Sequence, residues 1–269
     1  MADVVLAILA QADRAAAVLD AAERLAMLLG EARLTALPIG GSMPVAALAA
    51  AGTLGAVPVD LCVTWDPERI AAITAAFEAW TDAAPGRVGT RLIPASDDPG
   101  TVEEATRRAD WIVAATPRSS DDGSTRHAFR AALLHSERSV LALPSAAASF
   151  GTCVAVAWRD DPCARRAVLQ ATRVLHKAEK VVLLSGVRGD GPAPAFPAAL
   201  AEHGIAATQE RLQIASGAFG AVLLERAHAA GADMLVLGAY AHSPLREFLL
   251  GGVTRWMLEH ADLPLLMRH

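Results

Sequence analysis

Short apolar runs alternate with longer amphipathic segments along the whole chain, and this alternation starts again near residue 153. Runs such as Val4–Leu9 and Cys153–Trp158 have the length and composition of strands that are buried on both faces. The segments between such runs, of which Asp13–Leu29 is the clearest, repeat apolar residues at steps of three and four. Strands that alternate with helices in this way predict parallel sheets covered by helices on both faces.

The two halves of the chain also match each other. The sequence ADWIVAAT from Ala109 parallels ADMLVLGA from Ala232, and the predicted elements follow in the same order in both halves. We therefore predict a tandem repeat with a first domain at residues 1–147 and a second at 148–269. The alanine-rich stretch from Pro144 to Gly151 is the candidate linker.

Composition excludes several classes of protein. The 269 residues are 53% hydrophobic and 20% charged, which predicts a sizeable buried core rather than disorder. The net charge of −5 argues against nucleic acid or an anionic membrane as the main partner. With no apolar run of about 18 residues and no basic stretch before the first apolar run, we expect a cytoplasmic protein. We expect its cysteines, Cys62, Cys153 and Cys163, to be reduced.

The last 39 residues, Gly231–His269, carry the most specific pattern. An apolar run, Met234–Leu237, ends at Gly238, and a loop follows with a glycine pair before a helical segment that begins at Val253. Glycines let backbone N–H groups approach an anion, and the positive end of a helix dipole faces it, so this plan is typical of a phosphate cradle. Strand-to-helix loops without a ligand carry such glycines as well, and that alternative stays open.

This segment resembles the C-terminal signature of the universal stress proteins. Their nucleotide motif is a glycine, two residues, a glycine, nine residues, and then Gly-Ser or Gly-Thr. Gly238 and Gly251 match the first and third glycines, whereas Ala241 and Gly252 stand where the second glycine and the Ser or Thr are expected. The next residues, Val253 and Thr254, match the common continuation of the motif.

The resemblance implies an α/β fold of two tandem, open, parallel five-stranded sheets with flanking helices, which is the Rossmann-like, adenine-nucleotide α-hydrolase-like architecture. It also implies a stress-response regulatory module that binds ATP or AMP, with Mg²⁺ accompanying ATP, in the C-terminal domain. The two domains would form an intramolecular pseudo-dimer, and a homodimer is a further expectation. The expected nucleotide-binding residues are Asp160, Gly238, Ala241, Gly251, Gly252, Val253 and Thr254.

Three alternatives remain at this stage. Asp160, together with Asp161, could serve in helix capping rather than ligand contact. Because Ala241 and Gly252 depart from the motif, the chain could also be a protein of this fold that works through its interfaces without a nucleotide. An ATP-hydrolysing enzyme is less favoured, since related enzymes carry an SGGxDS loop where this chain reads WRDDPC. We expect no catalytic residues, and the histidine spacings predict no metal site.

The N-terminal half lacks the glycine pattern. Its counterpart of the signature, the segment that begins at Ala115, has no glycine at the strand exit, and Pro117 lacks an N–H donor. Gly123 alone remains in that loop. We therefore predict that the N-terminal domain is degenerate and that any nucleotide site lies in the C-terminal half.

Overall fold

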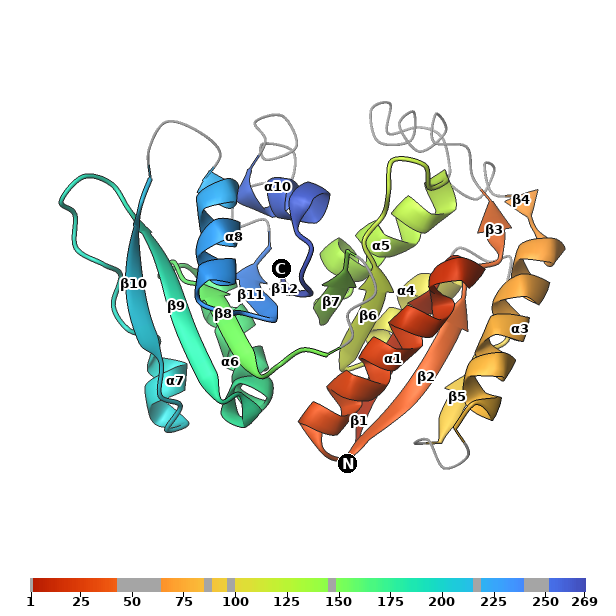
Figure 1. Ribbon diagram of the computed structural model, residues 1–269. Coiled ribbons are helices and arrows are strands. Elements are labelled where there is room, and N and C mark those ends of the chain that lie inside the picture. Colours follow the sequence, from red (N-terminus) through yellow and green to blue (C-terminus); the bar gives the residue numbers. More distant parts are fainter. Residues whose placement is uncertain are drawn as a thin grey trace. The chain divides into compact units, whose positions relative to one another are not determined.

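The chain divides into two compact units, which we call the N-terminal unit (Met1–Arg138) and the C-terminal unit (Ser139–His269). Figure 1 shows the computed structural model, in which both units are α/β structures. The structure describes residues 2–42, 64–84, 89–95, 100–144, 149–214, 219–239 and 252–269. The short helix that we predict between Gly41 and Asp60 lies outside the described residues.

The N-terminal unit is built on a parallel sheet with the strand order β5-β2-β1-β6. These strands are β1 (Asp3–Leu9), β2 (Ala32–Pro38), β5 (Thr90–Leu92) and β6 (Trp111–Ala115). The helices are α1 (Ala12–Leu29), α3 (Pro67–Asp82), α4 (Gly100–Arg108) and α5 (Gly123–His135). A small antiparallel ladder, β3 (Gly41–Ser42) with β4 (Thr64–Trp65), follows the end of β2. The sequence pattern did not predict this ladder, because two residues are too few to show a period.

The helices of this unit form two pairs on opposite sides of its sheet (Figure 1). Helix α1 packs against α3 and against β1 and β2, whereas α4 packs against α5. This arrangement follows from right-handed crossovers that run in one direction from β1 to β2 and in the other direction to β6. Strand β1 is therefore the point at which the strand order reverses, and its carboxyl end lies beside that of β6.

The C-terminal unit repeats this plan with five parallel strands in the order β10-β9-β8-β11-β12. The strands are β8 (Cys153–Ala157), β9 (Lys180–Val187), β10 (Thr208–Gln213), β11 (Met234–Gly238) and β12 (Leu265–Arg268). The helices are α6 (Pro162–Lys177), α7 (Ala198–Glu202), α8 (Phe219–Ala229) and α10 (Val253–His260). Helix α6 packs against α7 on one face of the sheet, and α8 packs against α10 on the other (Figure 1).

Strand β7 (Ser139–Leu143) lies near the boundary between the two units. The predicted boundary at residues 147 and 148 assigns it to the first domain, but the compact units assign it to the second. Within the second unit, β7 forms an antiparallel ladder with β12, in which Leu265 lies opposite Ala142 and Met267 opposite Val140. Every residue of β7 is buried. The pattern of apolar residues gives the position of this strand but cannot give its partner.

Two aspartates at equivalent positions make similar hydrogen bonds in the two units. In the N-terminal unit, Asp110 precedes β6 and its carboxylate accepts a bond from the backbone N–H of Val4 in β1 at 2.9 Å. In the C-terminal unit, Asp233 precedes β11, and its carboxylate accepts bonds from the N–H groups of Gly151 and Thr152, just before β8, at 2.8 and 2.9 Å. Each aspartate thus ties the first strand of its unit to the fourth, and these are the two strands at which the sheet order reverses.

We expect Asp233→Ala to lower the free energy of unfolding by about 1–3 kcal/mol, because it leaves two N–H groups without their charged acceptor. Urea unfolding of the full chain measures this difference. Asp190→Ala is the matched control, since Asp190 is an exposed loop residue of the same unit, and we expect a change within about 0.5 kcal/mol. Equal stability of the two variants would show that the clamp at Asp233 contributes nothing.

Candidate functional site

The carboxyl ends of the strands in the C-terminal unit collect most of the residues that the sequence singled out. In an open parallel sheet, ligands bind at this edge, where the strand order reverses, and here the reversal falls between β8 and β11. The edge is formed by the turn after β8, the end of β9, the end of β11 and the start of α10. The indole of Trp158, buried after β8, donates to the carbonyl of Ala195 at 2.7 Å and fixes the segment before α7 beside β8.

Asp160 lies on the exposed turn between β8 and α6. Its Oδ1 accepts a bond from Nε of Arg165 at 2.7 Å, and this bond is the main reason why the pKa of Asp160 is lowered. The helix cap is the neighbouring Asp161, whose Oδ1 accepts the N–H of Ala164 at 2.9 Å and whose carboxylate also pairs with Arg159. Capping therefore belongs to Asp161 alone, and Asp160 remains an exposed carboxylate that is paired with an arginine.

Close packing explains why residue 238 is a glycine, without any ligand. It ends β11 against the first turn of α6, where an added Cβ would lie 2.6 Å from the backbone N of Ala164 and 2.7 Å from the backbone C of Cys163. Backbone atoms at such distances cannot move aside cheaply. The first glycine of the expected motif is therefore required by the close approach of a strand and a helix.

Helix α10 has a glycine at its N-cap. Gly252 holds this position with φ −63° and ψ 165°, and among the described residues no side chain caps the helix. The first turn has no acidic residue, and the hydroxyl-bearing Thr254 is buried within it. The structure thus brings Gly252, Val253 and Thr254 together at a helix N-terminus on the carboxyl edge. Ala241 and Gly251 lie outside the described residues.

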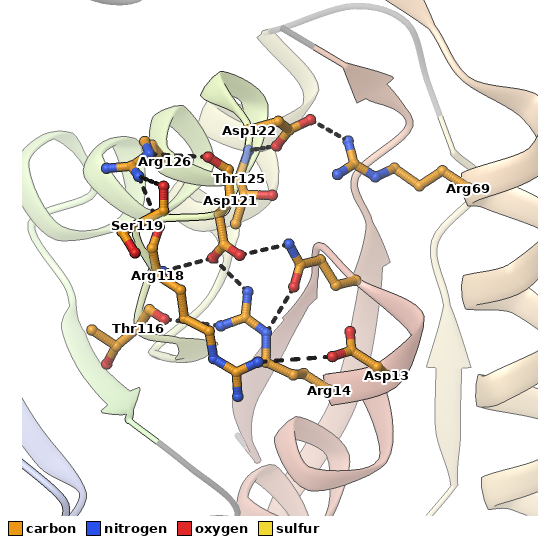
Figure 2. A network of polar contacts seen from close by, with 11 residues as sticks. Asp13, Arg14, Arg69, Thr116, Arg118, Ser119, Asp121, Asp122, Thr125 and Arg126 are labelled. Carbon is orange, nitrogen blue, oxygen red and sulfur yellow. Dashed lines mark hydrogen bonds and ion pairs between the residues drawn. The ribbon is translucent and has the colours of Figure 1, made fainter. Parts of the chain in front are cut away.

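The equivalent helix of the N-terminal unit, α5, is closed by its own side chain. Its N-cap residue is Asp122, with φ −73° and ψ 174°, and the carboxylate accepts the N–H of Thr125 at 2.9 Å. The same carboxylate pairs with Nη1 of Arg69, from α3, at 2.7 Å, as Figure 2 shows. Arg69 also donates to the carbonyl of Gly41 at 2.8 Å. The helix N-terminus thus meets a carboxylate that the chain itself supplies.

A buried ion pair lies beside this cap (Figure 2). The guanidinium of Arg14, in the first turn of α1, contacts Oδ2 of Asp121 at 2.6 Å, and both side chains are almost completely buried. Arg14 also donates to Oε1 of Gln11 at 2.9 Å and to the carbonyl of Thr116 at 3.0 Å. Asp121 accepts further bonds from Gln11 and from the backbone N–H of Arg118, each at 2.8 Å.

Sequence reasoning missed this network. It joins Gln11 and Arg14 to a segment more than 100 residues further along the chain, and a single arginine in the first turn of a helix is normally a surface residue. A partial signal was present, because Asp121 and Asp122 follow a strand exit and Arg14 follows the neighbouring strand exit. Parallel strands bring such segments to one edge of a sheet.

Comparison with protein families decides the assignment of the C-terminal half. Residues 153–269 match the model of the universal stress protein family. The C-terminal unit is a universal stress protein domain. The match covers β8 to β12 and thus the complete edge described above. A comparison with curated proteins found no match.

Solved structures extend the likeness in fold to the N-terminal unit. A universal stress protein from Archaeoglobus fulgidus superposes with a TM-score of 0.64 and 15% identity, over 99% of this chain and 96% of that protein. A candidate universal stress protein from Pseudomonas aeruginosa gives a TM-score of 0.51 and 14% identity, over 99% of this chain and 93% of that protein. At this level of identity the comparison shows the fold, a mostly parallel α/β architecture with flanking helices.

Other kinds of site find no support in the part of the chain that the structure describes. No three histidine, cysteine or acidic side chains gather there as a metal site would require. Cys153 and Cys163 are free thiols, and burial raises the pKa of Cys153. None of the described helices is long and apolar enough to cross a membrane.

The two aspartates of the N-terminal unit have lowered pKa values. Burial by itself raises the pKa of Asp121, but bonds from the backbone N–H of Arg118, from Gln11 and from Arg14 outweigh burial. Burial also acts to raise the pKa of Asp122, and the bonds from Arg69 and from the N–H of Thr125 outweigh it. Both groups therefore hold their negative charge more firmly in the folded chain than in the unfolded chain.

We expect Gly238→Ala to destabilise the universal stress protein domain by about 1–3 kcal/mol, because the new methyl group meets backbone atoms of α6. Chemical unfolding measures the change. Gly89→Ala is the matched control, since a Cβ at Gly89 would meet nothing within 4 Å. If Gly238→Ala were as stable as the control, close packing would not explain this glycine, and a role in ligand binding would be favoured.

We expect the stabilising effect of Asp121 and Asp122 to disappear in acid. A lowered folded-state pKa means that the unfolded chain binds protons first, so this stability is present above about pH 4 and is lost as the pH falls through the folded pKa. Asp121→Asn should unfold more easily than wild type at pH 6, by about 1–3 kcal/mol, and the difference should shrink toward pH 3. Unfolding in urea across this pH range measures it, with Asp190→Asn as the control. A difference that stays constant with pH would contradict the assignment.

Proposed function

We propose that this chain is a stress-response regulatory module whose C-terminal unit binds an adenine nucleotide, ATP or AMP. The observation that carries the proposal is the glycine N-cap of α10, with no acidic residue in the first turn, at the carboxyl edge of a universal stress protein domain. A helix N-terminus without its own carboxylate attracts an external anion through its backbone N–H groups and its dipole. The equivalent helix of the N-terminal unit carries Asp122 at this position, and so the proposal concerns the C-terminal unit alone.

The residues at this edge suit a phosphate chain. Gly252 and Val253 would offer backbone N–H groups, and Thr254 would add a hydroxyl. Mg²⁺ would accompany ATP and neutralise part of its charge. Asp160, together with Arg165, would lie near the adenosine part, as the family resemblance implies. The motif positions Ala241 and Gly251 complete the proposed set.

A second candidate is an interaction protein that has lost nucleotide binding. Its support is specific: the close packing of Gly238 against α6 explains this glycine without a ligand, and Ala241 and Gly252 depart from the motif. In that case the chain would act through its surfaces. A first experiment separates the two candidates. Purified protein is denatured, and any nucleotide that it releases is identified by chromatography and by its absorbance. The nucleotide-binding module should release an adenine nucleotide, whereas the interaction protein should release none.

We expect Gly252→Asp to weaken ATP binding at least tenfold, a loss of about 1.4 kcal/mol, because it places a carboxylate at the N-cap of α10 as Asp122 does at α5. The backbone angles of Gly252 and Asp122 are similar, so the aspartate fits without strain. Gly252→Asn is the matched control, because it caps the helix without a charge and should weaken binding much less. Calorimetric titration at fixed Mg²⁺ gives the affinities.

The opposite change tests the motif. Gly252→Ser combined with Ala241→Gly restores the family residues and should tighten ATP binding about tenfold, since a hydrogen bond to a charged group contributes about 1.5–3 kcal/mol. Affinity that is equal in wild type and in all variants would show that ATP binds elsewhere. No binding in any variant would favour the interaction protein.

A further inference from the structure

The carboxyl edge of the N-terminal unit is occupied by side chains of the chain itself. We propose that Asp122, held by Arg69, is an internal ligand at the N-terminus of α5 and closes this edge to external anions. Asp121, held by Arg14, closes the adjoining loop in the same way. The proposal concerns the N-terminal unit and does not depend on nucleotide binding by the other unit.

The comparison of α5 with α10 shows which feature distinguishes the two helix N-termini. Both helices follow the fourth strand of their sheet, and their N-cap residues share the same extended backbone conformation, with φ −73° and ψ 174° at Asp122 and φ −63° and ψ 165° at Gly252. The main difference at the cap is the side chain. The carboxylate of Asp122 takes the position at which the N–H groups and the dipole of a helix would otherwise attract an anion.

The guanidinium groups of Arg69 and Arg14 already have partners within the chain. Arg69 divides Nη1 between the carboxylate of Asp122 and the carbonyl of Gly41. The guanidinium of Arg14 donates to Gln11, to the Thr116 carbonyl and to Asp121. An external oxyanion that used Arg69 or Arg14 would have to displace the carboxylates with which they pair, and Figure 2 shows both pairs.

The pair of Arg69 and Asp122 is also shielded from water. The side chains keep only 16% and 22% of their exposure, so a guanidinium left here without a counter-ion would lose its partner while being poorly solvated. Removal of Asp122 alone should therefore create a vacancy that favours an anion. Arginine binds tetrahedral oxyanions well, because its planar fork donates two parallel bonds.

Hydroxyl groups provide a second and independent observation. The side-chain oxygens of Thr116, at the exit of β6, and of Ser124, in the first turn of α5, are buried and have no hydrogen-bond partner in the part of the chain that the structure describes. Buried hydroxyl groups normally have partners. The carboxyl edge of this unit therefore contains buried hydroxyl groups as well as the two aspartates.

The test is chemical rescue with inorganic phosphate. Asp122→Gly copies the cap of α10 into α5 and should lower the midpoint of thermal unfolding. Phosphate, titrated against chloride at constant ionic strength, should then raise the midpoint of this variant by about 2–4 °C more than that of wild type, along a saturating curve. Any phosphate bound by the C-terminal unit is common to both proteins and cancels in the comparison.

Two matched variants complete the experiment. Asp66 is the N-cap of α3, and its carboxylate accepts the backbone N–H of Arg69 at 3.0 Å. The variant Asp66→Gly removes this cap but keeps the side-chain pair of Arg69 and Asp122. Phosphate should therefore raise its unfolding midpoint no more than that of wild type. The double variant Asp122→Gly with Arg69→Met should lose the rescue, because the cation that holds the anion is gone. If Asp122→Gly folds too poorly to be measured, Asp122→Asn keeps a cap acceptor, removes the charge, and enters the same comparison.

Two results would overturn the proposal. One is a saturable phosphate effect in wild type that Arg69→Met abolishes, because the native edge would then already be open to anions. The other is an equal phosphate response in Asp66→Gly and in both Asp122 variants, because Asp122 would then be an ordinary cap that occupies no anion position.

Discussion

A helix that follows a strand of a parallel sheet brings its first backbone N–H groups to the carboxyl edge of that sheet, and those groups have no partners inside the helix. Both units must satisfy this requirement at the point where their strand order reverses. Helix α5 does so with Asp122 and α6 with Asp161, whereas α10 begins at a glycine. The chemistry of each edge follows from this choice of N-cap residue more than from the shape of the sheet, which the two units share.

Much of this architecture could be predicted from the sequence, because strands and helices impose periods of two and 3.6 residues on the apolar positions. The sequence offers Asp160 and Asp161 as possible helix caps, and the structure shows that Asp161 is the cap. Partners that are distant in sequence could not be predicted. The pairing of β7 with β12 and the bond between Arg14 and Asp121 depend on which segments meet in space, and nothing in the local pattern records that.

Gly238 illustrates a second limit of sequence patterns. A glycine is required both where a backbone must approach an anion and where a backbone must approach another backbone, and the letter is the same in both cases. Here the atoms that an added Cβ would meet belong to the backbone of Cys163 and Ala164. Motif spacing alone therefore overstates the evidence for a ligand at this glycine, whereas the glycine N-cap of α10 is observed at the edge itself.

The carboxylate of Asp122 has a consequence that concerns the cell rather than the fold. An anion that is covalently attached to the chain is present at an effective concentration set by the backbone, and this concentration does not change with the composition of the surroundings. A helix capped in this way is insensitive to metabolite levels. Helix α10 begins at a glycine, which supplies no carboxylate of its own, so an anion bound there as proposed would come from solution and be subject to mass action. In that case one chain would combine an edge with a fixed internal anion and an edge whose occupancy depends on the concentration of the ligand.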